Sequence, residues 1–228
     1  MTEAPDMRSL ASLIDHTILK PDATHAQIRR FCEEARQFGF RSVCVNSLHV
    51  PVVADWLAGS AAAVCAVVGF PLGAVSPAMK AAEAAEAVAG GASEIDMVID
   101  IGALKDGRVD AVREDIAAVR SAAHDATLKV IIETCLLTDD EKRIACRIAA
   151  MAGANFVKTS TGFSSGGATT ADVALMYAEV GPTVGVKASG GIRTLEVARA
   201  MLAAGATRIG TSAGVALVTQ TEPVSTGY

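Results

Sequence analysis

The sequence predicts an α/β fold, a single (β/α)8 (TIM) barrel over residues 1–228 with a short N-terminal helix and a mobile C-terminal tail from about residue 219. Eight short β-branched runs alternate with Ala-rich amphipathic stretches, and such alternation favours a parallel sheet. The same connection, a glycine followed by Ala or Phe, leads into a strand at Gly39, Gly91, Gly153 and Gly205. Eight units in 228 residues fit a closed barrel better than an open sheet.

The predicted strands share β-branched and apolar residues and lie at 14–17, 42–46, 64–69, 94–100, 129–133, 156–158, 184–187 and 208–210. The predicted helices are amphipathic and lie at 24–38, 51–58, 77–89, 108–123, 138–152, 170–179 and 194–204. Thr138 with Glu141 three residues later predicts a capping box, and Thr194 can cap the helix that follows it. Glycines such as Gly39 stand where helices are expected to end.

Composition narrows the class of protein. The net charge is -5 without a basic block, which argues against nucleic acid and anionic membranes as partners. Residues 57–79 carry no charge and are long enough to span a bilayer, but glycines and prolines interrupt them, so a buried strand and a loop are expected. The five cysteines form no C-x-x-C pair and no signal peptide is evident, which predicts reduced thiols in a cytoplasmic protein.

Two lysines each end a predicted buried strand. Lys158 lies in the segment 155–162 and Lys187 in 184–191, and small polar residues and glycine follow both. Burial disfavours the ammonium form of lysine, and a lysine of lowered pKa is a nucleophile toward carbonyl carbons. Two such lysines at corresponding positions indicate imine chemistry, in which one cation tunes the other.

The fourth predicted strand carries Glu94, Asp96 and Asp100 on one face and apolar residues on the other. The apolar face is expected to meet the helices, so the carboxylates point into the barrel. Catalytic side chains of such barrels stand at the C-terminal ends of strands. We therefore expect Asp96 and the two lysines to converge in one interior.

The alternative for this cluster is a structural ion pair between Asp96 and one lysine. The second lysine argues against it, because a single carboxylate would leave one cation over. Two cations about 5 Å apart repel by roughly 3 kcal/mol at an effective dielectric constant of about 20, which equals roughly two pKa units. Asp96 would then move protons rather than only neutralise charge.

Glycine-rich turns follow the last two predicted strands, at 189–192 and 210–214. Backbone N–H groups after the seventh and eighth strands of such barrels commonly bind phosphate, and small residues let the anion approach the chain. One such turn could be only a tight turn, but two at these places favour a phosphate site. A third glycine loop, at 162–167, can close over the same anion.

A metal site is not predicted, because the four histidines lack the spacing of zinc ligands. His16 ends a strand, where a hydrogen-bonded structural role is expected. Cys44 shares an inward face with Ser42 and Asn46 and is a candidate for lining the site, although packing is the more common role of a buried thiol. The dinucleotide fingerprint G-x-G-x-x-G is absent.

These motifs resemble, nearly from end to end, the deoxyribose-phosphate aldolases, class I aldolases, in their short bacterial type. The matching segments are LIDHT (13–17), LKP (19–21), SVCVN (42–46), GFPLG (69–73), EIDMV (94–98), KVIIET (129–134), FVKTSTGF (156–163), VKASGGIR (186–193) and RIGTS (208–212). The resemblance implies an aldehyde-lyase that reversibly cleaves 2-deoxy-D-ribose 5-phosphate to D-glyceraldehyde 3-phosphate and acetaldehyde. It implies no cofactor, and a place in deoxyribose phosphate catabolism.

The resemblance also assigns roles by motif position. Lys158 is implied to be the Schiff-base lysine and Asp96 the proton donor or acceptor. Lys187 is implied to lower the pKa of Lys158 and to relay protons. The implied residues of the substrate and phosphate site are Gly162, Gly190, Gly191, Gly210 and Ser212. Further candidates are Asp15, Cys44 and Tyr228.

The chain departs from the family pattern at Asp100 and Ser165, where many short members are expected to have Asn and Thr. Asp100 is expected to add a negative charge beyond Asp96 and so to affect local pKa values, but not the reaction. Tyr228 ends a polar tail and is expected either to reach over the site and assist proton transfer to the enamine, or to be a bystander.

Two rival functions stay open on the sequence. One is a phosphate-binding isomerase with Asp96 or Glu133 as its base, and the other is a sugar-phosphate-binding barrel without catalysis. The complete set of Asp96, Lys158 and Lys187 favours the aldolase, because a pure binding protein has no need of a second buried lysine. A homo-oligomer, specifically a dimer, is expected from the apolar composition and the resemblance.

Overall fold

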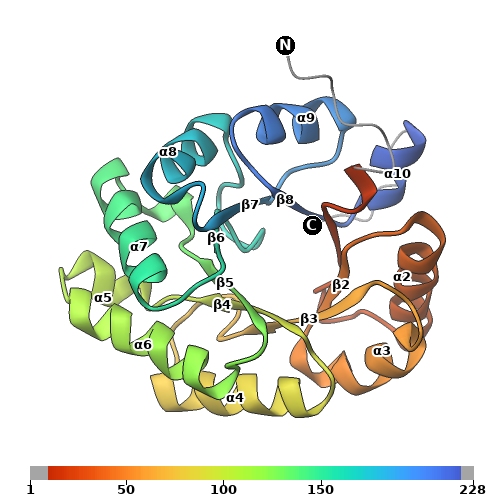
Figure 1. Cartoon of the computed structure of the whole chain (residues 1–228), viewed down its shortest axis with the longest axis horizontal. Coiled ribbons are helices and arrows are strands. Elements are labelled where there is room, and N and C mark those ends of the chain that lie inside the picture. The colour runs from red at the N-terminus through yellow and green to blue at the C-terminus, as the bar shows by residue number, and fades with distance from the viewer. Residues whose placement is uncertain (1–9, 222–228) are drawn as a thin grey trace.

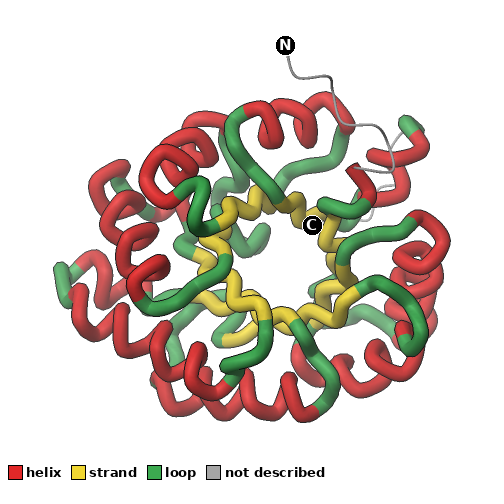
Figure 2. Tube along the Cα trace, in the orientation of Figure 1, coloured by secondary structure: helices red, strands yellow, loops and turns green. Residues whose placement is uncertain are grey.

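The computed structural model describes residues 10–221 and contains a closed barrel of eight parallel strands (Figure 1). The strands pair in chain order, and the last strand pairs with the first, which closes the sheet. Helices surround the strands, which form the inner ring in Figure 2. The predicted (β/α)8 barrel is confirmed. The expected N-terminal helix falls largely, and the tail beyond residue 221 wholly, outside the described residues.

The strands of the ring are β1 (Ile14–Thr17), β2 (Ser42–Val45), β3 (Ala63–Val68), β4 (Glu94–Val98), β5 (Thr127–Ile131), β6 (Phe156–Lys158), β7 (Gly185–Ser189) and β8 (Arg208–Thr211). The longer helices are α2 (His25–Phe38), α3 (Val50–Leu57), α4 (Pro77–Ala89), α6 (Val109–Ala122), α7 (Asp139–Met151), α8 (Thr170–Val180) and α9 (Leu195–Ala203). Short helical segments that the sequence did not predict are η1 (Ser47–His49), α5 (Ile101–Lys105), η2 (Thr134–Leu136) and α10 (Gly214–Thr219).

Capping side chains set the ends of the helices, as expected from the sequence. Thr138 and Glu141 form the predicted capping box at α7, and Thr194 accepts a hydrogen bond from the Val197 N–H at α9. Gly39 ends α2 in the left-handed conformation, with φ of 72°. These caps satisfy backbone groups that would otherwise be left without partners at the helix ends.

The two faces of the sheet bury different kinds of side chain. The large apolar core lies between the sheet and the helices and includes Ile95, Met97 and Val130. Inside the ring lies a group of buried charged side chains, with a small apolar cluster made by Leu19, Cys44, Cys65 and Val67. This alternation confirms that the apolar face of β4 meets the helices and its carboxylates point inward.

Gly185 on β7 makes room in the interior, as predicted. A Cβ atom at this position would lie 2.4 Å from the Phe156 ring, so even alanine would collide with the neighbouring strand. The Phe156 ring in turn lies under the Arg208 guanidinium, 5.1 Å from its centroid. The glycine therefore allows an aromatic ring on β6 and a cation on β8 to stack near the start of the strands on either side of β7.

The uncharged stretch at 57–79 contains the strand β3 and the loop after it, as predicted, and runs from the end of α3 to the first turn of α4. No helix within residues 10–221 is both long and apolar enough to cross a membrane. All five cysteines lie in this part of the chain and are free thiols.

Candidate active site

Lys158 and Lys187 end up side by side in the barrel. They are direct partners in the register of β6 with β7, and both bind the same oxygen, Oδ2 of Asp96. The Nζ–Oδ2 distances are 2.8 Å from Lys158 and 2.7 Å from Lys187. The predicted convergence of the three side chains is thereby confirmed.

A third lysine, which sequence analysis did not single out, completes this contact. Lys129 lies on β5 in register with Asp96, and its Nζ is 2.6 Å from Asp96 Oδ1 and 2.7 Å from Glu94 Oε2. Its side chain is fully buried. Asp96 therefore accepts contacts from three ammonium groups, two on one oxygen and one on the other.

Asp15 and Arg208 extend the charge network toward the start of the strands. Asp15 Oδ2 lies 2.5 Å from Lys187 Nζ, and Arg208 binds both Asp15 Oδ1 at 2.7 Å and Glu94 Oε2 at 2.9 Å. The expectation that one carboxylate faces two lysines is thus incomplete. The interior holds Asp15, Glu94 and Asp96 against three lysines and Arg208, so one positive charge is in excess.

This network shifts the ionisation of its members. Burial alone would raise the pKa of the Asp96 carboxyl, but the surrounding lysines, Lys129 foremost, hold that pKa well below its ordinary value. Burial and Lys187 likewise oppose each other at Asp15, and the lysine prevails and lowers its pKa. Burial would lower the pKa of Lys187, but Asp15 and Asp96 raise it. The Asp96 carboxyl is consequently ionised at neutral pH, the form that can accept a proton.

Acid should weaken the fold through these carboxylates. The folded-state pKa of Asp15 is below the unfolded value, so its stabilising contribution is present above about pH 4 and is lost as the pH falls through the folded pKa. We expect the unfolding free energy, measured in urea between pH 5 and 2.5, to depend less on pH in Asp15→Asn than in the wild type. The difference in slope should reach up to about 1.4 kcal/mol per pH unit. Equal slopes would contradict this role.

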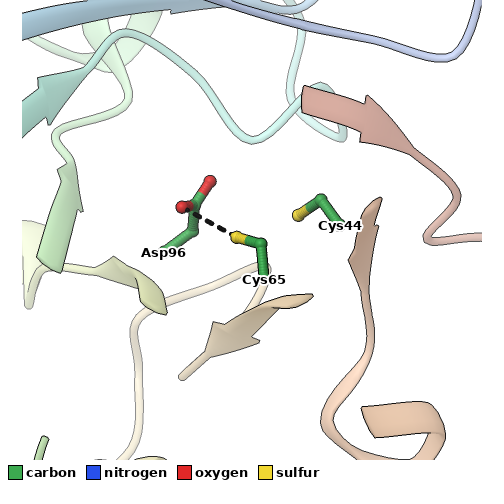
Figure 3. A group of neighbouring side chains, drawn as sticks. All are labelled: Cys44, Cys65 and Asp96. Carbon is green, nitrogen blue, oxygen red and sulfur yellow. Dashed lines mark hydrogen bonds between the residues drawn. The ribbon is translucent and has the colours of Figure 1, made fainter. Parts of the chain in front are cut away.

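Cys44 and Cys65 lie beside Asp96, and one ligand atom from each of the three lies within 4.8 Å of the others (Figure 3). The Cys65 thiol donates to Asp96 Oδ1 at 3.2 Å, and Lys129 Nζ is 3.3 Å from its sulfur. A hydrogen bond with Cys65 lowers the pKa of Cys44, whereas burial raises that of Cys65. A metal ion here would have to displace ammonium groups from Asp96, so hydrogen-bonded thiols suit the surroundings better than a metal site.

A pocket opens above this network at the C-terminal ends of β6, β7 and β8. It brings together Lys158 and all the predicted phosphate-site residues, which are Gly162, Gly190, Gly191, Gly210 and Ser212. Of the three catalytic candidates, Lys158 alone lines the pocket, while Asp96 and Lys187 lie fully buried beneath it. A ligand in the pocket would therefore meet the Lys158 amine first.

Backbone groups of the pocket are suited to an anion. The N–H groups of Gly162, Gly191 and Ser212 donate to no protein acceptor within residues 10–221. Gly162 and Gly191 have φ of 86° and 78°, a conformation that favours glycine. Gly190 directly precedes Gly191 and has φ of 89°, and successive backbone N–H groups in such turns form concave sites for anions.

Two cations that sequence analysis missed stand at the mouth of the pocket. Arg193 lines it directly, and Lys20 lines the wider opening that it shares with the loop at 162–167. Both stand inside the motifs LKP (19–21) and VKASGGIR (186–193), and their charge beside the predicted phosphate turns is the signal that could have identified them. Their charge would complement a phosphate, which glycine N–H groups alone cannot neutralise.

The glycine loop at 162–167 packs against the turn after β7. The N–H of Ala168 donates to the Gly190 carbonyl at 3.1 Å, and a Cβ atom on Gly167 would lie 2.4 Å from that oxygen. The loop therefore adjoins the same pocket. Its closure over an anion stays a prediction.

Two candidate residues take no part in the described site. β4 ends at Val98, so Asp100 does not continue its inward face; instead its Oδ1 accepts a hydrogen bond from the Ala103 N–H and caps α5. His16 faces outward and donates or accepts a hydrogen bond with Glu34 at 2.7 Å, which confirms its structural role. Tyr228 lies outside the described residues.

Comparison with known proteins points to one family. Residues 9–219 match the DeoC/LacD family of aldolases. The deoxyribose-phosphate aldolase of Brevibacillus brevis is 58% identical over 215 residues, which cover 94% of this chain and 97% of the relative. That of Rhodospirillum rubrum is 61% identical over 218 residues, which cover 96% and 92%. The solved deoxyribose phosphate aldolase of Aeropyrum pernix, described as a tetramer, is 32% identical with a TM-score of 0.89 and covers 94% and 92%.

Proposed function

The chain belongs to the DeoC/LacD family of aldolases, and from this premise we propose that it reversibly cleaves 2-deoxy-D-ribose 5-phosphate to D-glyceraldehyde 3-phosphate and acetaldehyde through a Schiff base on Lys158. One observation carries the mechanism. The Lys158 amine lines a pocket of glycine turns and shares a single carboxylate oxygen with Lys187. A role in deoxyribose phosphate catabolism follows from the reaction.

Formation of the Schiff base begins with proton transfer. Lys158 can pass a proton to Asp96 Oδ2, which lies 2.8 Å from its nitrogen. The neutral amine then attacks the aldehyde carbon of the open-chain sugar to give a carbinolamine. Protonation of the carbinolamine hydroxyl expels water and leaves an iminium ion.

Cleavage uses the iminium ion as an electron sink. Loss of the proton from the C3 hydroxyl breaks the C2–C3 bond, which releases glyceraldehyde 3-phosphate as an aldehyde and leaves an enamine on Lys158. Protonation of the enamine carbon and hydrolysis of the resulting imine release acetaldehyde and the free lysine. Asp96, with Lys187 2.7 Å from its Oδ2, is placed to exchange these protons.

Binding of the phosphate sets the position of the reacting carbon. The turns at Gly190, Gly191 and Gly210 lie on the same pocket as Lys158, with Arg193 beside them. Held there, a five-carbon sugar would present its aldehyde end to the amine. Such positioning supplies much of the rate enhancement when two reacting groups must meet.

Borohydride trapping tests the central step. Incubation with acetaldehyde and borohydride, followed by peptide mass mapping, should show a reduced two-carbon adduct on Lys158. A sample without acetaldehyde controls for unrelated modification. If no lysine carries an adduct while the folded protein still binds the sugar phosphate, the aldolase mechanism is wrong and an isomerase or a binding protein becomes the better proposal.

We also infer a homodimer in a reducing, cytoplasmic compartment. Leu48 on η1, Leu72, and Met79 on α4 are apolar and exposed by 83%, 74% and 63%. Ser47 Oγ donates to Glu83 at 3.1 Å, so η1 and α4 are neighbours. An exposed apolar area of this kind supports association between two copies of the chain. The free thiols support a reducing, cytoplasmic compartment. Light scattering coupled to size exclusion would give the number of subunits.

A further inference from the structure

We propose that Glu133 is a positioning residue that holds the Thr161–Gly162 segment of the phosphate pocket in place. This inference rests on the proposed aldolase function and concerns how the same pocket recognises the phosphate end of its substrate. Glu133 lies two residues after Ile131, the end of β5, whereas Thr161 and Gly162 belong to the loop after β6. Glu133 itself is absent from the residues that line the pocket.

The contact between the two segments is buried and made twice. Glu133 Oε2 accepts a hydrogen bond of 2.5 Å from the Thr161 hydroxyl, and both of its carboxylate oxygens lie 3.3 Å from the Thr161 backbone nitrogen. Glu133 is 2% exposed and Thr161 is 5% exposed. Bonds of this kind to a carboxylate are stronger than those between neutral groups, so the segment is firmly attached to the turn after β5.

The backbone of Glu133 supports a special role. Its φ is 55°, in the left-handed region that residues with a side chain rarely adopt. Such a conformation persists only where the surroundings impose it, and it occurs often at functional sites. Here the Thr134 N–H donates to the Thr159 carbonyl at 2.9 Å, so the turn after β5 is fastened to the strand end that carries Lys158.

The contact between Glu133 and Thr161 determines which hydrogen-bond donors of the loop are available to a ligand. The Thr161 hydroxyl donates to Glu133 and accepts from the Phe163 N–H at 3.0 Å, so its own donor is not free for the pocket. The next residue, Gly162, lines the pocket, and its N–H donates to no protein acceptor within residues 10–221. Fixing Thr161 on both its hydroxyl and its N–H thus fixes the neighbouring Gly162 N–H for an anion.

A base role for Glu133, as in the rival isomerase, fits this geometry poorly, because its carboxylate is already committed to Thr161. Glutamine has the same size but offers only one acceptor oxygen. Its amide group would set an N–H against the Thr161 N–H or hydroxyl. Glu133→Gln should therefore loosen the segment while leaving Lys158, Asp96 and Lys187 in place.

The test compares a phosphorylated with an unphosphorylated substrate. In Glu133→Gln we expect KM for 2-deoxyribose 5-phosphate to rise about 10-fold, with kcat changed less than about 3-fold. A change of this size corresponds to the loss of one hydrogen bond between the Gly162 N–H and the charged phosphate. For 2-deoxyribose, kcat/KM should stay within about 2-fold of the wild type, because no phosphate is held. Thr161→Val should reproduce the selective loss, and Thr161→Ser, which keeps the hydroxyl, should restore wild-type selectivity.

Asp172→Asn is the matched control. Asp172 is a largely buried carboxylate that lies outside the pocket and binds Lys142, with 2.6 Å between its Oδ1 and Lys142 Nζ. Its loss should therefore lower stability but leave the ratio of kcat/KM for the two substrates unchanged. If Glu133→Gln unfolds, Thr161→Val carries the test. The positioning role is overturned if Glu133→Gln and Thr161→Val leave the ratio of kcat/KM for the two substrates unchanged, or lower both values equally. In that case turnover and the Lys158 adduct in the wild type would still support the proposed aldolase. If the wild type showed neither turnover nor a Lys158 adduct, the proposed function itself would be wrong.

Discussion

Replacing Lys158 with arginine is expected to lower kcat/KM for 2-deoxyribose 5-phosphate by about 10⁴-fold or more, in a protein that remains folded. The guanidinium can still pair with Asp96 Oδ2, where the lysine nitrogen lies 2.8 Å away, so the charge of the interior is preserved. Arginine stays protonated in proteins and cannot attack an aldehyde. Charge is therefore kept while the nucleophile is lost.

Steady-state turnover and borohydride trapping check this result together. The variant should give neither product nor a two-carbon adduct at position 158. Lys105→Arg is a suitable control, because Lys105 is half-exposed and bonds Glu141 on the surface, and it should behave as the wild type. Turnover within 100-fold of the wild type in Lys158→Arg would be inconsistent with a Schiff base on this lysine.

Lys129→Met is expected to lower the free energy of unfolding by about 3–5 kcal/mol, because it removes one partner from a buried ionic network. Lys129 is fully buried and lies 2.6 Å from Asp96 and 2.7 Å from Glu94. Methionine fills a similar volume, so the cost comes from carboxylates that lose their partner in a medium of low polarity. Urea unfolding at pH 7 measures it.

Two comparisons sharpen this prediction. Lys105→Met removes a surface ion pair and should cost about 1 kcal/mol or less. Adding Glu94→Gln to Lys129→Met should recover part of the loss, since contacting residues have non-additive effects. A cost below about 1 kcal/mol for Lys129→Met alone would mean that Lys187 and Arg208 compensate the carboxylates without it.

Much of this site was predictable because periodic patterns report which way a side chain points. The alternation in β4 predicted that Asp96 points inward, and the structure confirms it. Lys158 and Lys187 were recognisable because each charged residue ends a buried run. Their closeness then followed from the barrel, since consecutive parallel strands place corresponding ends together.

Lys129 and Arg208 were missed for a definite reason. The fifth strand was predicted to begin at residue 129, whereas β5 begins at Thr127, so Lys129 lies in mid-strand between Leu128 and Val130. In mid-strand, alternation with Leu128 and Val130, which face the helices, places its side chain inside. Arg208 does begin β8, and a charged residue at a strand start is usually solvated, so nothing local indicated that Asp15 and Glu94 surround it.

Other features depend on contacts between distant segments. The pairing of Glu133 with Thr161 joins residues 28 positions apart, and local sequence does not encode it. The left-handed backbone at Glu133 is likewise imposed by the surrounding turn. Asp100 shows the opposite error, because a periodic pattern was extended past Val98, where the strand ends and a helix begins.

The separation of the apolar core from the charged interior has a consequence for how such a protein can change. The residues that hold helices to strands lie on one face of the sheet, and the charged residues proposed to perform the chemistry lie on the other. Substitutions at inward positions near the mouth can therefore alter which aldehydes are accepted without disturbing the packing that maintains the shape. A barrel divided in this way can acquire new substrates at little cost to its folding.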